Sequence, residues 1–169
     1  MDLDSMPMAG CAICQLLSNT PERDYVVAQS KYWRITLAPD QYYVGRCYVT
    51  TLRHVPELSV LSPEEWADLH EVIRHLENSA KRELSATHVT WAALMNNAYQ
   101  LADPQPHVHW HVRPRYAART IVGDVVMTDE HFGHHHQREE QQHLLPYQME
   151  EIVTNLRRSL PPPWWSTFR

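Results

Sequence analysis

Three histidines alternate with apolar residues in the segment PHVHWHVRPR, residues 106–115. Neighbouring side chains of a β-strand point to opposite faces, so His107, His109 and His111 would share one face. Arg113 would continue this row, while the intervening valines and tryptophan pack into the core. Such a row is costly as structure alone, because imidazoles need hydrogen-bond partners and repel one another once protonated. The pattern therefore indicates a functional site.

Phosphoryl chemistry suits these residue types best. A neutral imidazole can attack phosphorus, a neighbouring imidazolium can protonate the leaving group, and arginine can bind phosphate oxygens bidentately. Two other interpretations compete with it. Successive histidines on one strand face fit a three-histidine metal site only with suitable rotamers, and a solvated polar face would have no chemical role.

The segment HVHWHVR resembles the signature of the histidine-triad family, His-φ-His-φ-His-φ-φ, in which φ is apolar. The following Pro-Arg is common in the branch related to dinucleoside polyphosphate hydrolases. Residues 45–55 resemble the family's glycine, strand, basic residue and histidine upstream of a long helix. Together these similarities cover residues 10–115.

The resemblance implies a role for each polar residue. His109 would be the nucleophile that forms a nucleotidyl-histidine, His111 would contact the α-phosphate or bridging oxygen, and His107 would orient the site. Asn96 and Asn97 both lie near a polar position that contacts phosphate in the family. We therefore expect an enzyme, a nucleotide hydrolase or transferase acting at the α-phosphate of a dinucleoside polyphosphate or nucleoside phosphoramidate.

Arg113 departs from the family pattern, in which this position is apolar. Its side chain could reach substrate phosphates, which would favour longer polyphosphates. It could equally form an ion pair near a dimer surface. The alternation of the strand leaves both interpretations open.

A possible metal site begins with Cys11 and Cys14, a C-x-x-C pair that is weak evidence alone. With His54 and a histidine of the triad strand, the pair completes a Cys₂His₂ set, the usual composition of a closed structural zinc site. The resemblance points to His107 as the fourth ligand, since some relatives bind zinc through the first triad histidine. We expect structural Zn²⁺ and no organic cofactor; a reduced, unliganded cysteine pair is the alternative.

Other histidines and the third cysteine carry less information. His70 and His75 are five residues apart, so they would point about 140° apart on a helix. The run at 134–136 is expected in a solvated loop rather than at a metal. Cys47 lies in an apolar stretch and is expected to be buried.

The elements that must position these residues follow from periodicity and capping. Ser62 and Pro63 begin a long amphipathic helix that fades near Leu84. A short helical turn should follow the cysteine pair, residues 96–106 should be a loop, and Pro114 should stop the histidine strand. Expected strands cover residues 25–28, 32–37, 47–51, 89–94 and 107–113, and a second helix covers 147–159. The fold should be α+β, with an antiparallel sheet of five strands, the long helix on one face and a C-terminal helix.

The whole chain of 169 residues should form one domain, with a C-x-x-C segment at 1–20 and an extended tail at 160–169. The net charge of -5 without a basic stripe disfavours duplex nucleic acid as a partner. No apolar run reaches the roughly 18 residues of a membrane span, and no signal segment is visible, so a cytoplasmic protein is expected. The resemblance implies a homodimer that joins two sheets into one.

Two other function classes stay open at this point. One is a nucleotide-binding regulatory protein with little turnover, and the other is a zinc-stabilised interaction module. The sequence does not choose between water and phosphate as acceptor, nor does it name the leaving group or the base.

Overall fold

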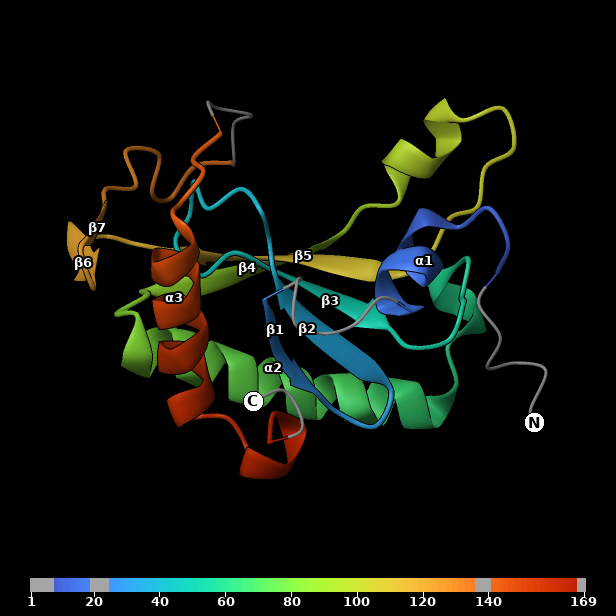
Figure 1. Cartoon of the computed structure of the whole chain (residues 1–169), viewed down its shortest axis with the longest axis horizontal. Helices are drawn as coiled ribbons and strands as arrows, with labels where there is room; N and C mark the ends of the chain where they lie inside the picture. The colour runs from blue at the N-terminus through green and yellow to red at the C-terminus, as the bar shows by residue number, and fades with distance from the viewer. Residues whose placement is uncertain (1–7, 19–24, 136–140, 167–169) are drawn as a thin grey trace.

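The histidine segment lies within a five-stranded antiparallel sheet (Figure 1). The computed structural model describes residues 8–18, 25–135 and 141–166. The strand order is β1-β2-β3-β5-β4, so the histidine strand β5 is flanked on both sides. The strands are β1 (Val26–Gln29), β2 (Trp33–Leu37), β3 (Cys47–Thr51), β4 (His88–Ala93) and β5 (His109–Arg115). The expected α+β class and five-stranded antiparallel sheet are confirmed.

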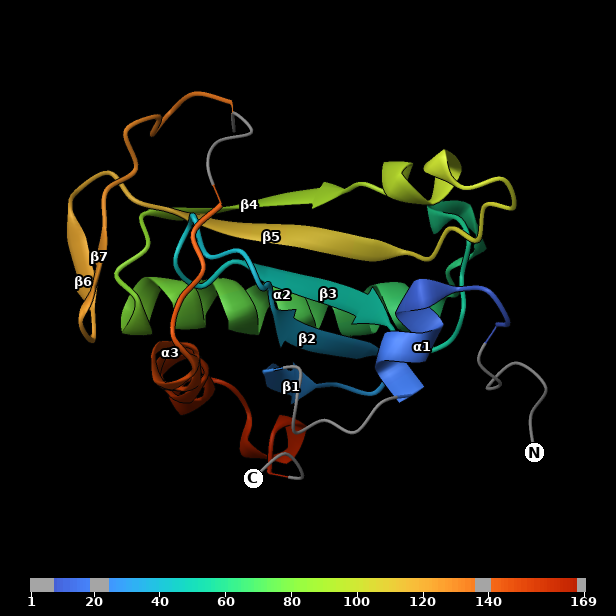
Figure 2. The ribbon, with the colours of Figure 1, turned by 45° about the horizontal axis from the view of Figure 1, so that its top comes forward.

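Helix α2 (Pro63–Glu83) covers one face of this sheet (Figure 2). It begins as expected, with Ser62 as N-cap, proline in the first turn and a reciprocal capping box with Glu65. On the sheet side, Trp110 of β5 lies 6.5 Å from the ring of Trp66, centroid to centroid. The apolar residues of β5 therefore face α2, and its histidines occupy the opposite face.

Two further helices lie around the sheet. Helix α3 (Pro146–Arg158) packs against α2 and β1, and its Arg157 donates hydrogen bonds to the carbonyls of Val26 and Val27. Helix α1 (Ala12–Ser18) includes the short helical turn expected after the cysteine pair, but it begins earlier and contains Cys14. It lies near the end of β3, beside the point where the chain enters β5 (Figure 1).

The histidine strand differs from the sequence-based expectation at both ends. It begins at His109 rather than His107, and it continues through Pro114 to Arg115. The carbonyl of Arg115 accepts a hydrogen bond from Thr87 on the β4 side, so the nitrogen of Pro114 points the other way. On that other side lies β3, whose pairing with β5 ends at Cys47 and Val112. No ladder donor is needed at Pro114, which explains why the proline does not stop the strand.

Several short elements also differ from the sequence-based expectation. A hairpin of β6 (Thr120–Val122) and β7 (Val125–Met127), turned at Gly123 with φ +60°, was not expected. The supposed loop at 96–106 contains the 3₁₀-helix η4 (Asn96–Gln100). The tail is not extended at 162–164, since η5 (Pro162–Trp164) is a 3₁₀ turn; another, η3 (Leu58–Val60), precedes α2. Residues 1–7, 19–20 and 167–169 of the terminal segments, and His136 of the histidine run, lie outside the described residues.

Two smaller expectations can be checked directly. Cys47 is fully buried in the core, as expected. None of the helices described is long and apolar enough to cross a membrane.

Candidate active site and metal-binding cluster

His109 and His111 project from the sheet face opposite α2, next to Tyr48 of β3. Tyr48 pairs with His111 across the two strands, and Thr50 pairs with His109. The ring centroids of His109 and His111 are 5.1 Å apart, and that of Tyr48 is 5.1 Å from His111. The strand register therefore brings the two histidines into one compact group, as their alternation predicted.

The tautomer of His109 is set by the backbone. Its Nδ1 lies 2.8 Å from the carbonyl oxygen of His107, so Nδ1 carries the proton and donates it. Burial lowers the pKa of His109, and the bond to this carbonyl opposes the effect only in part. The ring is therefore neutral near pH 7, with the lone pair of Nε2 available for attack. This is the arrangement that a nucleophilic imidazole requires.

His111 is also neutral in the free protein. Burial lowers its pKa to about 4, the positive charges of Arg113 and Arg46 act in the same direction, and the backbone of Leu94 opposes them only in part. Its Nδ1 is buried without a hydrogen-bond partner among the described residues. The imidazolium expected as proton donor is thus not present before an anion binds, because burial and then the neighbouring guanidinium groups disfavour it.

A cavity of about 520 Å³ opens beside these residues. His109, His111, Tyr48 and Asn97 lie in its lining, whereas Asn96 and Arg113 do not. Further polar side chains of the lining are Tyr25, Arg34, Thr36, Thr50 and His143. Such a volume and a mostly apolar wall are typical of small-molecule sites. The apolar wall comes chiefly from α1 and the β1–β2 region, through Ile13, Leu16, Leu17, Val26 and Leu37, with Pro39, Leu144 and Met149.

The two asparagines are therefore distinguished by position. Both belong to η4 and both are exposed. Only Asn97 lines the cavity that contains the histidines. Of the two amides, Asn97 is therefore the one placed beside the histidines.

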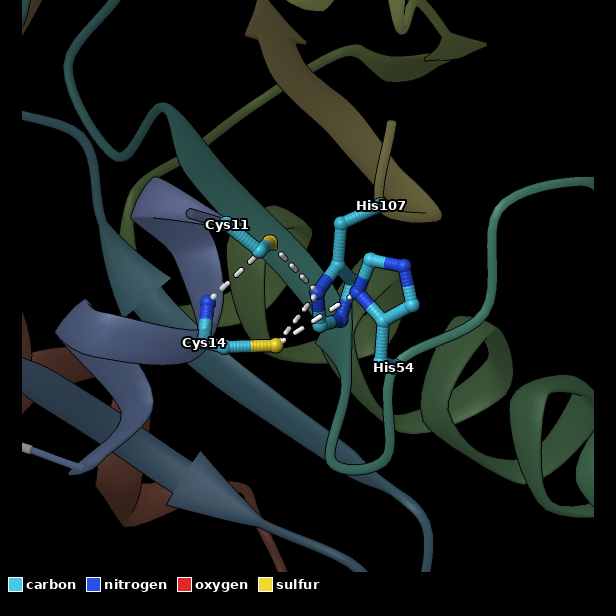
Figure 3. Close-up of side chains that lie close together, drawn as sticks. All are labelled: Cys11, Cys14, His54 and His107. Atoms are coloured by element: carbon cyan, nitrogen blue, oxygen red, sulfur yellow. Dashed lines mark hydrogen bonds between the residues drawn. The ribbon is translucent and has the colours of Figure 1, made fainter. Parts of the chain in front are cut away.

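Four potential metal ligands meet where α1 approaches the start of β5 (Figure 3). The ligand atoms of Cys11, Cys14, His54 and His107 all lie within 4.8 Å of one another. Three sulfur–nitrogen separations are 3.5 Å: from Cys11 to His107, and from Cys14 to both histidines. Tetrahedral zinc with bonds of about 2.3 Å to sulfur and about 2.05 Å to nitrogen would require about 3.6 Å. The donor set fits zinc in both composition and spacing.

The orientation of His107 also fits a ligand. Its Nε2 lies 2.9 Å from the carbonyl oxygen of Thr51, so Nε2 donates and Nδ1 is left facing the two sulfurs. Burial lowers the pKa of His107 to about 4, which keeps the ring neutral as metal binding requires. A backbone carbonyl that fixes a histidine in this way is typical of metal sites. The same residue then holds His109 through its own carbonyl.

Sequence reasoning missed several parts of this site, among them Arg34 of the cavity lining. Tyr48 lies between the histidines and Arg46, whose Nη2 donates to the Tyr48 hydroxyl at 3.4 Å. Alternation along β3 offered a signal for Tyr48, but only if the register with the histidine strand were known. The wall contributed by α1 gave no sequence signal, because apolar residues of a short helix resemble ordinary core residues.

His70, His75, His134 and His135 do not line the cavity, whereas His143, which the sequence did not single out, does. His75 lies against Trp164, with ring centroids 5.1 Å apart, and the backbone carbonyls of His131 and His134 accept hydrogen bonds from Arg115. Among the described residues, the four ligands named above are the one cluster of metal-binding side chains.

Comparison with known proteins identifies the family. The family model described as the HIT domain matches residues 20–118, which is more than half of the chain. The chain belongs to the HIT domain family. No curated protein matches it in sequence.

Solved structures share the fold. A Hit-like protein involved in cell-cycle regulation from Bartonella henselae, solved with an unknown ligand, aligns with TM-score 0.63 and 14% identity over 90% of this chain and 98% of that one. A Zn-bound histidine triad family protein from Mycobacterium smegmatis aligns with TM-score 0.55 and 20% identity over 88% and 94%. The diadenosine triphosphate hydrolase of Plasmodium falciparum, in complex with cyclomarin A, aligns with TM-score 0.55 and 17% identity over 83% and 76%. Similarity at these identities establishes the shared fold.

Proposed function

We propose that this protein transfers the nucleotidyl group of a nucleotide to His109 and then to water or another acceptor. The observation that carries the proposal is the hydrogen bond between Nδ1 of His109 and the carbonyl of His107 at 2.8 Å. It leaves Nε2 free beside a cavity large enough for a nucleoside. The diadenosine triphosphate hydrolase with the same fold supports a nucleotide as substrate.

In the first step, Nε2 of His109 forms a bond to the α-phosphorus while the bond to the leaving group breaks. The leaving group departs with the electron pair of that bond. The phosphorylated ring becomes cationic, and its Nδ1–H then donates more strongly to the His107 carbonyl. His111 and Asn97 are placed to donate hydrogen bonds to the phosphate oxygens.

In the second step, an acceptor attacks phosphorus and the bond to Nε2 breaks. Water as acceptor releases a nucleoside monophosphate and a proton, and His109 returns to its neutral form. Inorganic phosphate as acceptor would instead release a nucleoside diphosphate. The same residues serve both reactions, so the choice of acceptor needs an experiment.

The cysteine–histidine cluster is proposed to hold one structural Zn²⁺. Cys11, Cys14, His54 and His107 would be its ligands, as their spacing and neutral imidazoles favour. The zinc-bound family protein with the same fold supports this assignment. When bound, zinc would link α1 to the chain entering β5. No part of the phosphate chemistry passes through the metal.

The activity is tested by steady-state turnover of a small panel by the zinc-loaded protein. The panel contains adenosine phosphoramidate, diadenosine triphosphate, diadenosine tetraphosphate and a nucleotide sugar. Each substrate is assayed with and without inorganic phosphate, and the His109→Ala variant is assayed in parallel. We expect at least one substrate to be cleaved at the α-phosphate by the wild type alone. Acceleration by phosphate, with a nucleoside diphosphate as product, would identify a phosphorylase.

Absence of turnover on every substrate would distinguish between the two other function classes. If no substrate turned over while nucleotide monophosphates bound tightly, the protein would be a nucleotide-binding regulator and the enzymatic proposal would be wrong. If neither turnover nor nucleotide binding occurred, and metal removal unfolded the chain, the zinc-stabilised interaction module would be favoured.

We also propose that two copies pair through β4. Within the described part of the chain, β4 pairs only with β5, and its outer edge offers unpaired backbone groups. The other edge of the sheet is different, because Arg157 of α3 donates to the carbonyls of β1 at 3.0 and 2.7 Å. Pairing of two β4 edges would give the continuous sheet implied by the resemblance.

Replacing the exposed His88 of β4 by lysine is expected to convert this dimer to a monomer, because a charged side chain on an edge strand disfavours strand pairing. Sedimentation velocity would give the mass, and circular dichroism would check the fold. Val126→Lys, on the exposed face of β7, is the control with the same chemistry. A wild-type protein that sediments as a monomer at assay concentration would contradict the proposal.

A further inference from the structure

Arg113 is a buried arginine without a matching acceptor. Its side chain follows His111 on the histidine face of β5, and only 7% of the residue is exposed. Its Nε is buried and has no hydrogen-bond partner among the described residues, and the ion pairs found there do not include it. A buried cation without partners is costly, so its presence requires an explanation.

The neighbouring charges increase this cost. Cys47 of β3 pairs with Val112 of the antiparallel strand β5. Arg46 and Arg113 lie one residue beyond this pair, so they are opposite one another. Burial lowers the pKa of Arg113, and the positive charge of Arg46 lowers it further. Two guanidinium groups therefore lie together beside His111.

The carboxylate in this region is already engaged. Asp40 forms an ion pair with Arg46 and also accepts hydrogen bonds from the backbone nitrogens of Tyr42 and Gln142, at 3.0 and 3.1 Å. Nε of Arg46 is itself buried without a partner. One carboxylate for two guanidiniums leaves a surplus of positive charge at this position.

Arg115 lies on the same strand face and, unlike Arg113, is fully paired with other groups of the protein. It binds both oxygens of Asp129, at 2.6 and 3.0 Å, and donates to the carbonyls of His131 and His134. The fold thus supplies every partner that Arg115 needs and none for Nε of Arg113. Among the described residues no carboxylate pairs with Arg113, so an ion pair within the chain does not account for its buried charge.

We propose that Arg113 and Arg46 form a second anion subsite, which binds a phosphate of the leaving group. This inference rests on the proposed function, since it places the α-phosphate at His109 and His111. Same-face positions of a strand are about 7 Å apart, so the next position after His111 is within reach of a phosphate chain. Tyr48 connects the two subsites, because it lines the cavity and its hydroxyl accepts a hydrogen bond from Arg46.

A substrate preference follows. Nucleotides whose leaving group is itself phosphorylated, such as dinucleoside polyphosphates, would use the second subsite. Nucleoside phosphoramidates, whose leaving group is an amine, would leave it without an anion. Planar guanidinium groups suit phosphate oxygens, to which they donate two parallel hydrogen bonds.

The test combines binding of inorganic tripolyphosphate, measured by calorimetry, with turnover of two substrates. Arg113→Gln is expected to weaken tripolyphosphate binding by about tenfold or more, as loss of a charge-assisted hydrogen bond implies. The same variant should reduce, by about the same factor, the ratio of kcat/KM for diadenosine tetraphosphate to that for adenosine phosphoramidate. Arg113→Lys should recover part of both effects, because it restores the charge without the bidentate geometry.

Arg74→Gln is the matched control, since it removes one exposed positive charge from α2, on the other face of the sheet. It should alter neither quantity, and thermal unfolding will show whether each variant is folded. Equal tripolyphosphate binding by wild type and Arg113→Gln would overturn the subsite. Equal losses on the two substrates would overturn the preference. Binding that depends on Arg113 in a protein without turnover would support the subsite and reject the proposed function, so the two failures are distinguishable.

Discussion

His109→Ala is expected to lower kcat on the fastest substrate by about 10⁴-fold or more, as loss of a catalytic nucleophile does in other enzymes. The imidazole of His109 is the group whose tautomer is fixed for attack, through its bond to the His107 carbonyl. His111 does not have this arrangement, because it lies near the backbone of Leu94 and its Nδ1 makes no hydrogen bond of the geometry found at His109. A substitute nucleophile is therefore not available at the same position.

The measurement is a steady-state rate together with mass spectrometry of protein quenched during turnover. Wild-type protein should carry a nucleotidyl group on the peptide that contains His109, under alkaline quench because the phosphorus–nitrogen bond is acid-labile. His111→Ala is the informative comparison, with an expected loss of about 10²-fold, typical for a group that assists by hydrogen bonding. That variant should still form the adduct, whereas His109→Ala should not. An adduct on His111 in the wild type would show that the two roles are assigned in the wrong order.

Local patterns predicted most of the elements that position this site. Ser62, Pro63 and Glu65 gave the start of α2, because a capping box is complete within four residues. Alternation gave the face of His109 and His111, because the side-chain period of a strand does not depend on its partners. The cluster of Cys11, Cys14, His54 and His107 was also correctly assembled from motif composition and resemblance.

What the sequence did not predict depends on partners distant along the chain. Pro114 was expected to end its strand, and it does not because β3 offers no acceptor beside it. The neutral state of His111 follows from burial and from Arg113 and Arg46, whose positions depend on the sheet register. The sequence also could not show that Arg115 takes the carboxylate of Asp129, the contrast on which the proposal for Arg113 is based.

Metal removal is the second change with a large expected effect, and it acts on stability. Zinc that binds only the folded chain stabilises it by about 4 kcal/mol when free zinc is about 1,000 times its dissociation constant. For a chain of this size we expect chelation to lower the unfolding temperature by roughly 8–16 °C. Cys14→Ser should lower the zinc content from about one per chain towards zero and reproduce this shift, because Cys14 Sγ contacts both histidines of the cluster.

Cys47→Ser is the matched control for this experiment. Burial raises the pKa of the Cys47 thiol to about 12, and its sulfur lies 3.3 Å from the carbonyl of Gly45, so it is a poor metal ligand. Its substitution should leave the zinc content unchanged when measured by elemental analysis.

The effect of metal removal on turnover should be smaller than the effect on stability. The carbonyl of His107 holds His109, but the backbone around it is also fixed by the bond from the Val108 nitrogen to the Val55 carbonyl, at 2.7 Å. We therefore expect folded, metal-free protein to keep measurable turnover well below its unfolding temperature. Zinc content near zero after expression in zinc-replete medium, with an unfolding temperature that chelation does not change, would instead mean that Cys11 and Cys14 are an unliganded pair packed against two neutral imidazoles.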